Sequence, residues 1–375
     1  MITQCPYCGD ENIFTYFYVE KMPTVLSACK KEMARKVKSY PFRAMVCGSC
    51  WLGFNASPLP PNELRDIYDD YLYISPMDGI GHSKYKNILE TIKRSCGQGD
   101  KIVDIGCADG YLLHQLKQIG YTNLLGVEPS ILSGVGRENG LEIIKGYFSP
   151  DIFDDGTVDC FILMHVFEHF DNPFLMLEMM KQKLSPKGKI LLEVPYFSGE
   201  HHQHLFFYNL IFLKRLCSDI GLTISNIEID DDTKTLRVIL DKTDIFIDIS
   251  ILERPVDILD LCLRKNKEYQ NKIVQINFLL REKKNIVWWG AGSTSVIYLN
   301  QVDQNILKEA KLTVIDGDKN KWGLYIPIIN AMVWPFTILK DKQIDKLIVA
   351  SSFAGEIKET LRLNNISVNN METFV

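Results

Sequence analysis

The chain has 375 residues, of which 46% are hydrophobic and 24% charged. Its length predicts more than one domain, and no apolar run is long enough to cross a bilayer. A formal net charge of −5 gives no general attraction to phosphate backbones, so we expect no nucleic-acid partner and no membrane association. The first residues, MITQCPYCGD, lack the pattern of a signal peptide, and a cytoplasmic location is expected.

Two cysteine pairs with C-x-x-C spacing stand near the N-terminus, namely Cys5 with Cys8 and Cys47 with Cys50. Each pair places two thiolates on one tight turn, and together they supply the four soft ligands that tetrahedral zinc prefers. Four cysteine ligands leave no open coordination position, so we expect structural Zn²⁺. The basic residues between the pairs are interpreted as a solvated stretch, with a nucleic-acid surface or an anion site as alternatives.

The expected elements that follow alternate between helix and strand. A proline-rich break at 57–61 ends the zinc module, and a helical pattern covers 83–94. Short apolar runs predict strands at 101–105, 124–127, 160–164 and 189–194. Residues 222–229 and 236–240 are expected to form an antiparallel hairpin. This alternation is typical of a Rossmann-like α/β domain, in which helices wrap a parallel sheet.

A second α/β pattern occupies the C-terminal part of the chain. One amphipathic helix is expected over 251–284, and strands over 285–289, 312–315 and 346–350, with the loop GAGSTS at 290–295. We therefore predict four segments. They are a zinc-binding module (1–62), a methyltransferase domain (63–246), a helical linker (247–284) and a small Rossmann-like substrate-side domain (285–375).

A loop of small residues follows the strand at 101–105. Asp104, Gly106, Ala108 and Gly110 stand two positions apart, which differs from the G-x-G-x-x-G spacing of dinucleotide-binding loops and resembles motif I of class I methyltransferases. Glu128 ends the next strand, where a carboxylate can accept both ribose hydroxyls of a nucleoside. S-adenosyl-L-methionine (SAM) is thus the expected cofactor. Its predicted binding residues are Asp104, Gly106, Cys107, Ala108, Gly110, Glu128, Pro129 and His165.

Five of the seven histidines follow the third and fourth strands of this sheet. They are His165 and His169 in HVFEHFDNP, and His201, His202 and His204 in EHHQHL. Because the carboxyl ends of parallel strands share one edge, we expect these loops to converge where such sheets bind ligands. A histidine can remove a proton near neutral pH. A histidine-rich metal site is the alternative interpretation.

The chain resembles the three-module family of bacterial sugar C-methyltransferases over nearly its full length. The likeness rests on CPYC and CGSC, YLYISPMDGIGHSKY, the SAM loop with Glu128, the histidine loop, WWGAGSTS, IDGDKNKWGLYIPI and IVASSFAGEIKETL. In that family a Glu-His-Leu motif carries the proposed base, and Gln203-His204-Leu205 corresponds to it here. The resemblance implies His204 as base, with Gln203 and Tyr73 beside it. His169 and Glu200, which lie on the two histidine-bearing loops, are further catalytic candidates. Glu200 is a candidate replacement for the missing glutamate.

The resulting hypothesis is methyl transfer from SAM to a carbon of a nucleotide-linked keto-deoxysugar, after His204 removes the proton next to the ketone. The first alternative is an O- or N-methyltransferase acting on a sugar, a polysaccharide precursor or another small molecule. Others are an NAD-binding protein that uses GAGSTS and a zinc-ribbon nucleic-acid modifier. GAGSTS itself is interpreted either as a diphosphate-binding loop or as a plain strand-to-helix turn. The sequence does not specify the oligomeric state.

Overall fold

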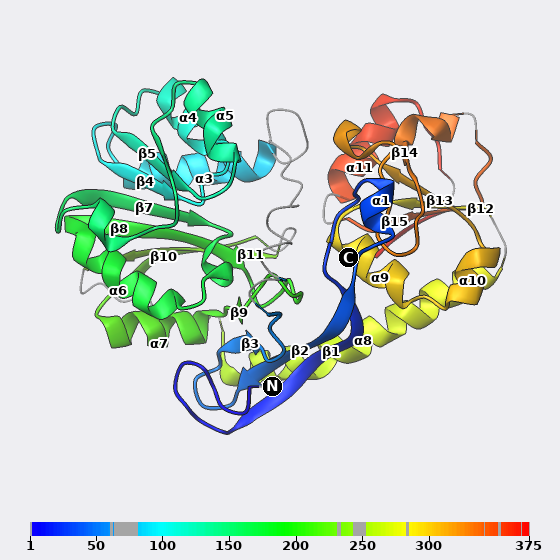
Figure 1. The fold of residues 1–375 in the computed structure, drawn as a ribbon, viewed down its shortest axis with the longest axis horizontal. Coiled ribbons are helices and arrows are strands. Elements are labelled where there is room, and N and C mark those ends of the chain that lie inside the picture. The colour runs from blue at the N-terminus through cyan, green and yellow to red at the C-terminus, as the bar shows by residue number, and fades with distance from the viewer. Residues whose placement is uncertain are drawn as a thin grey trace. The chain divides into compact units, whose positions relative to one another are not determined.

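The computed structural model describes residues 2–60, 63, 82–230, 234–242, 253–282, 285–340, 342–351, 354–368 and 370–374 (Figure 1). Its internal contacts divide them into two units. The first unit holds the described residues of 1–14, 45–56 and 73–258, and the second those of 15–44, 57–72 and 259–375. The predicted module 1–62 is therefore shared between the units.

A seven-stranded sheet forms the centre of the first unit, in the order β10-β11-β8-β7-β4-β5-β6. Its strands are β4 (Ile102–Ile105), β5 (Leu124–Glu128), β6 (Ile143–Lys145), β7 (Val158–Met164), β8 (Leu184–Pro195), β10 (Thr223–Asp230) and β11 (Thr235–Asp241). The strands from β8 to β6 pair in parallel, and the β10–β11 hairpin adds to β8 in antiparallel fashion. The predicted parallel sheet is confirmed. Strand order reverses at β4, which is where such sheets bind ligands.

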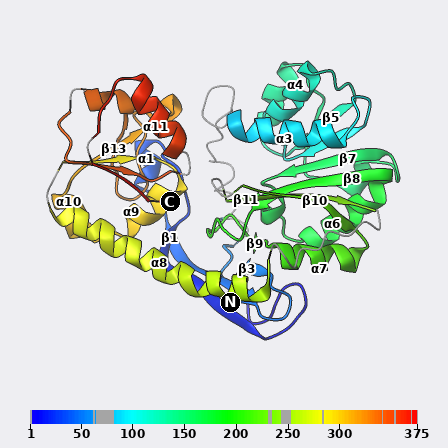
Figure 2. The ribbon, with the colours of Figure 1, turned by 180° about the vertical axis from the view of Figure 1, so that it is seen from behind.

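Helices cover both faces of this sheet because its central strands are apolar on both sides. The helices are α3 (His82–Ser95), α4 (Tyr111–Gln118), α5 (Leu132–Glu138), α6 (Pro173–Lys183) and α7 (Leu210–Ile220). Along β7, Cys160 and Ile162 share a core with α3 and α4. The alternate residues Phe161 and Leu163 pack with α6 and α7. Figure 2 shows these two helical layers on either side of the strands. This arrangement fits the period of two along a strand.

The cysteine-bearing segment of the first unit packs against the histidine loop. Strands β3 (Gly53–Asn55) and β9 (Phe206–Phe207) pair in this unit, whereas β1 (Ile13–Pro23) and β2 (Ser39–Cys47) lie mostly in the second unit. β3 and β9 are antiparallel, with Phe54 opposite Phe206. The Asn55 N–H donates to the Leu205 carbonyl at 2.9 Å, and its side-chain Nδ2 donates to the His204 carbonyl at 3.4 Å. The N-terminal segment thus holds the backbone of His204.

The second unit has a parallel five-stranded sheet in the order β14-β13-β12-β15-β16. Its strands are β12 (Asn285–Trp289), β13 (Lys311–Asp316), β14 (Val333–Pro335), β15 (Lys346–Val349) and β16 (Met371–Thr373). Its helices are α1 (Lys31–Ala34), α9 (Ser293–Gln301), α10 (Gln304–Glu309) and α11 (Ala354–Leu363). The predicted second Rossmann-like fold is confirmed.

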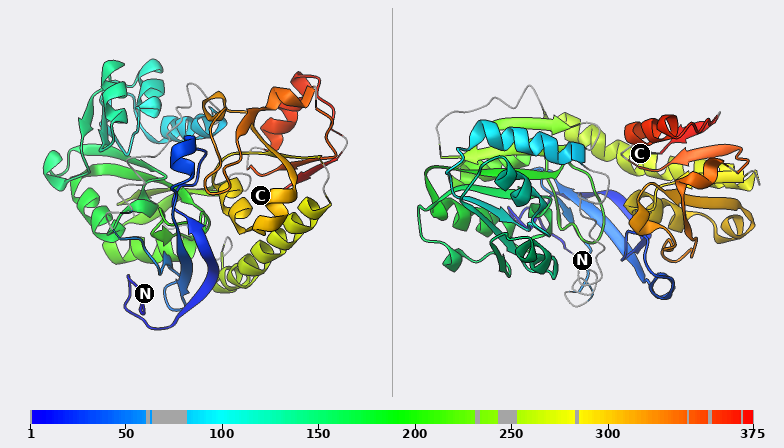
Figure 3. Two further views of the ribbon diagram at one scale, coloured as in Figure 1. Left: turned by 45° about the vertical axis from the view of Figure 1, so that its right-hand side comes forward. Right: turned by 90° about the horizontal axis from the view of Figure 1, so that it is seen from above.

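The expected long helix is α8 (Pro255–Arg281), which contributes Ile276 and Leu280 to the core around Trp288. The opposite face of the sheet carries Ile357 and Leu361 of α11. Figure 3 shows α8 and α11 on opposite sides of the strands. Among the described residues, no helix combines the length and the apolar content that crossing a membrane would need.

Candidate active site

The loop between β4 and α4 is shaped by two glycines. Gly106 and Gly110 have φ angles of 71° and 78°, in the left-handed region that disfavours residues with a Cβ. A Cβ at Gly106 would lie 2.5 Å from Val166 Cγ2, and one at Gly110 would lie 2.4 Å from Leu141 Cδ1. Both positions therefore require glycine for conformation and for space, and between them Ala108 also has a positive φ of 51°.

Glu128 joins this loop to the end of β5. Its Oε2 accepts the Ala108 N–H at 2.9 Å and its Oε1 accepts the Ser130 N–H at 2.8 Å. The carboxylate is only 7% exposed. The structure therefore brings together the acid and the loop that the sequence placed in separate segments. Of the neighbouring predicted residues, Cys107 is buried and Pro129 is exposed.

A second buried carboxyl group, that of Asp104, lies beside Glu128 under the loop. Asp104 is 4% exposed, and burial, reinforced by the charge of Glu128, raises the pKa of its carboxyl to about 8. Burial also raises the pKa of the Cys107 thiol well above its usual range. A cationic group bound here would favour the ionised form of Asp104, so the electrostatics suit a positively charged ligand.

A second cluster forms where β7 and β8 end. The short 3-10 helix η2 (Phe167–His169) carries Glu168, which is 1% exposed. Glu168 Oε1 lies 3.5 Å from His165 Nδ1 and 3.9 Å from His204 Nε2. Within the part of the chain that the structure describes, neither oxygen of this carboxylate has a hydrogen-bond partner. An acid that the sequence analysis did not select is thus central to the histidine cluster.

The loop after β8 brings further histidines to the same place. The ring of His204 lies 4.8 Å from that of His169 and 3.9 Å from that of His201, measured between centroids. Burial, followed by the neighbouring histidines, lowers the pKa of His201 to about 3 and that of His204 well below 6.5. His169 Nδ1 lies 2.8 Å from the Gln203 carbonyl oxygen. The four histidines at 165, 169, 201 and 204 therefore form one cluster.

Of the other predicted catalytic residues, Gln203 and Glu200 lie on the loop that carries His204. Gln203 is buried, and its backbone carbonyl, not its side chain, makes the contact with His169. Glu200 is half-buried on the same loop. His202 is buried beside the cluster. Tyr73 lies outside the described residues.

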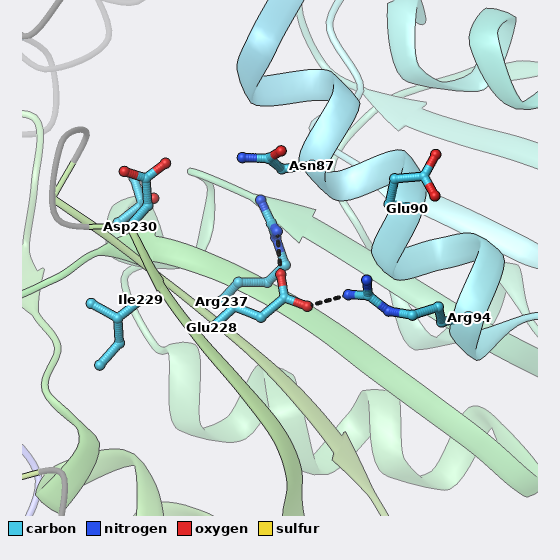
Figure 4. A pocket seen from close by; sticks show the side chains of 8 residues that line it. Asn87, Glu90, Arg94, Glu228, Ile229, Asp230 and Arg237 are labelled. Atoms are coloured by element: carbon cyan, nitrogen blue, oxygen red, sulfur yellow. Dashed lines mark hydrogen bonds and ion pairs between the residues drawn. The ribbon is translucent and has the colours of Figure 1, made fainter.

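A buried ion-pair chain extends from the cluster to a surface groove. His165 Nε2 lies 3.0 Å from Glu193 Oε1, and Arg237 Nη2 lies 2.5 Å from Glu193 Oε2. Arg237 Nη1 also pairs with Glu228 at 2.6 Å. Figure 4 shows Arg237 and Glu228 lining the groove, which has a volume of about 560 Å³, with Arg94 paired to Glu228. The sequence analysis missed Glu193, although a charged residue inside the apolar run ILLEVP is a signal for a buried partner.

The four paired cysteines converge in the first unit. Sγ–Sγ distances are 3.5 Å for Cys5 with Cys50 and 3.6 Å for Cys8 with Cys47, and all four sulfurs lie within 4.8 Å of one another. Tetrahedral zinc with bonds of about 2.3 Å separates its sulfur ligands by about 3.8 Å. The donor set and its spacing therefore fit a closed zinc site.

Comparison with known proteins identifies the class of this unit. Residues 80–226 match the family described as "Methyltransferase domain". That stretch contains the glycine loop, Glu128 and the whole histidine cluster. The chain therefore carries a class I SAM-dependent methyltransferase domain.

More specific relatives are distant. The chain is 24% identical over 209 residues to the C-methyltransferase NovU of Streptomyces niveus, covering 51% of this chain and 49% of that protein. It is 28% identical over 123 residues to a tRNA U34 carboxymethyltransferase of Campylobacter hominis, covering 29% of this chain and 41% of the relative. The chain thus spans about half or less of these curated relatives. Among solved structures, PH0226 of Pyrococcus horikoshii has a TM-score of 0.39 and 16% identity, covering 48% of this chain and 99% of that one.

Proposed function

We propose that this protein transfers a methyl group from SAM to a carbon of a nucleotide-linked keto-deoxysugar. The observation that carries the proposal is the convergence, at the carboxyl ends of one parallel sheet, of the acid-bound glycine loop and the cluster around His204. The partial likeness to a C-methyltransferase supports carbon as the acceptor. The nucleotide-sugar acceptor rests on the family resemblance of the sequence.

The glycine loop is the proposed donor site. Glu128 has further lone pairs on both oxygens, beyond those that accept the Ala108 and Ser130 N–H groups, and these can accept ribose hydroxyls. Asp104, buried beside Glu128, suits a cationic ligand, and SAM carries a sulfonium. When bound, SAM supplies an electrophilic methyl group with its leaving group already in place. The chain's part is to bind the donor and to align it with the acceptor carbon.

His204 is the proposed base. Its imidazole takes the proton from the carbon next to the ketone, and the C–H electron pair becomes that of the enolate. The enolate carbon then bonds to the methyl group as the methyl–sulfur bond breaks, which leaves S-adenosylhomocysteine. The Glu168 carboxylate, 3.9 Å from His204 Nε2, can stabilise the imidazolium that forms.

A second candidate is an O- or N-methyltransferase. It is favoured by Gln203, an uncharged residue where the resembled family has glutamate, and the tRNA-modifying relatives would extend the acceptor to nucleic acid. The net charge of −5 supports a small-molecule acceptor instead.

Hydrogen exchange distinguishes these candidates. In deuterated buffer without SAM, the protein should introduce deuterium at the carbon next to the ketone of a nucleotide-linked keto-deoxysugar, as measured by mass spectrometry. His204→Ala should abolish this exchange, whereas His114→Ala, which changes a histidine on α4, should retain it. Methylation of an oxygen or nitrogen with no such exchange would favour the second candidate.

We further propose structural zinc at Cys5, Cys8, Cys47 and Cys50, in a reducing cytoplasm that keeps the thiols available. The pairing of β3 with β9 gives this ion a role in the active site, because the segment that follows Cys50 holds the His204 backbone. Loss of zinc should therefore lower methyl transfer before it unfolds the central sheet.

A further inference from the structure

The cluster at the end of β7 contains a buried carboxylate, that of Glu168, whose charge and hydrogen-bonding capacity are not compensated by the described residues. Glu168 is 99% buried, its two oxygens have no hydrogen-bond partner among the described residues, and it points toward imidazoles. A buried carboxylate in this state is costly unless a cation or hydrogen-bond donors compensate it. One ligand atom each from Glu168, His169 and His204 lies within 4.8 Å of the other two.

The orientation of His169 adds a second observation. Its Nδ1 lies 2.8 Å from the Gln203 carbonyl oxygen, which can only accept a hydrogen bond. Nδ1 therefore carries the hydrogen, and Nε2 keeps a lone pair. Histidines that bind metals commonly donate their other ring N–H to a carbonyl or carboxylate in this way.

We propose that Glu168, His169 and His204 bind a divalent first-row transition-metal ion. Two imidazoles and one carboxylate are ligands that such ions accept, and three protein ligands leave open positions, in contrast to the four cysteines. Bonds of about 2.1 Å would place the ligand atoms about 3.0–3.4 Å apart. The 3.9 Å between Glu168 Oε1 and His204 Nε2 therefore has to close by about 0.5–0.9 Å on binding.

The bound ion would polarise an acceptor oxygen and so acidify the neighbouring carbon or the hydroxyl itself. When the ion is bound, the lone pair of His204 Nε2 is used for metal binding. This nitrogen can therefore remove a proton only when the site holds no metal. The metal proposal does not depend on the identity of the methyl acceptor. Binding of the ion is therefore measured separately from methyl transfer.

Titration with Mn²⁺ of protein that holds one equivalent of zinc per chain, which the four thiolates bind first, tests the proposal. Zinc fills the cysteine site, and Mn²⁺ prefers oxygen and nitrogen ligands to thiolates. Loss of the free Mn²⁺ signal in electron paramagnetic resonance should show one tight site in the wild type. Glu168→Gln and His169→Ala should each weaken binding at least tenfold, and His114→Ala should not. Absence of a site, or equal binding by Glu168→Gln and the wild type, would overturn the proposal.

A measurement on the unmodified chain covers the case in which these variants fold poorly. Paramagnetic Mn²⁺ should broaden the ring proton signals of His169 and His204 at substoichiometric concentration and leave that of His114 sharp. Uniform broadening of all histidine signals, or none, would contradict the assigned site.

Discussion

The chain contains two glycine-bearing loops that follow the first strand of a sheet, and their backbones are fixed in the same way. In the first unit Glu128 accepts the N–H groups of Ala108 and Ser130 at 2.9 and 2.8 Å. In the second unit Asp316 accepts those of Ala291 and Asp318 at 2.8 and 2.9 Å. An acid at the end of the neighbouring strand thus stabilises both turns.

The two loops differ in the side chains that contact them. The second loop is closed from within, because Ser295 Oγ donates to the Gly290 carbonyl at 2.6 Å and accepts Trp288 Nε1–H at 2.7 Å. Its acid also has a cation nearby, with Lys321 Nζ 3.4 Å from Asp316. In the first loop the buried acid beside Glu128 is Asp104, whose pKa is raised by burial. A glycine loop bound by an acid is therefore a structural turn in itself, and we infer that a cofactor site also needs a second buried acid that a cationic ligand can ionise.

The largest expected effect is on SAM affinity, when the acid that supports each loop, Glu128 or Asp316, is replaced. Glu128→Ala should reduce the affinity for SAM at least 100-fold, because the loop loses its support and the ribose its acceptor. Asp316→Ala should leave the affinity within threefold. Equilibrium dialysis with labelled SAM measures both. Equal losses in the two variants would show that the loops are not functionally distinct.

The Ser295 side chain inside the second loop should contribute to protein stability but not to SAM binding. Ser295→Ala removes the partner of the buried Trp288 N–H and should lower the free energy of unfolding by about 1–3 kcal/mol. Affinity for SAM should not change. Denaturant titration and dialysis on the same preparation test this, and a weakened SAM affinity would contradict the assignment of the donor to the first loop alone.

Backbone conformation gives a matched pair of glycine substitutions. Gly106→Ala places a Cβ 2.5 Å from Val166 Cγ2 at a positive φ, and should cost about 1–2 kcal/mol in stability and weaken SAM binding about tenfold. Gly292→Ala meets no atom within 4 Å at an ordinary φ of −106° and should be silent. Thermal unfolding with and without SAM compares them. A silent Gly106→Ala would remove the steric argument for the first loop.

The last prediction is a pH dependence of stability caused by Asp104. Its folded pKa of about 8 lies above the unfolded value of about 3.9, so the folded chain holds a proton between these values that the unfolded chain has lost. The free energy of unfolding therefore falls as pH rises through this window, whereas Asp104→Asn should not show this fall. Melting temperatures of both proteins at pH 5 and pH 8 test the sign. An equal change in melting temperature between pH 5 and pH 8 in the two proteins would show that Asp104 is ionised in the folded state.

Local patterns predicted much of this fold because its strands are short apolar runs and its loops carry small residues. The region 101–128 is an example, since strand, glycine loop and acid lie close together in sequence. The pairing of β3 with β9 was not predictable, because it joins residues about 150 positions apart through backbone contacts that leave no local signal. Glu168 and Glu193 were missed because a carboxylate's role depends on burial and on partners from other strands, such as Arg237.

The central claim is that the first loop binds the methyl donor, and calorimetry tests it most directly. Titration of the zinc-loaded wild-type protein with S-adenosylhomocysteine should show saturable binding at one site per chain. The absence of binding heat at several temperatures, with no change in melting temperature at millimolar ligand, would contradict the account.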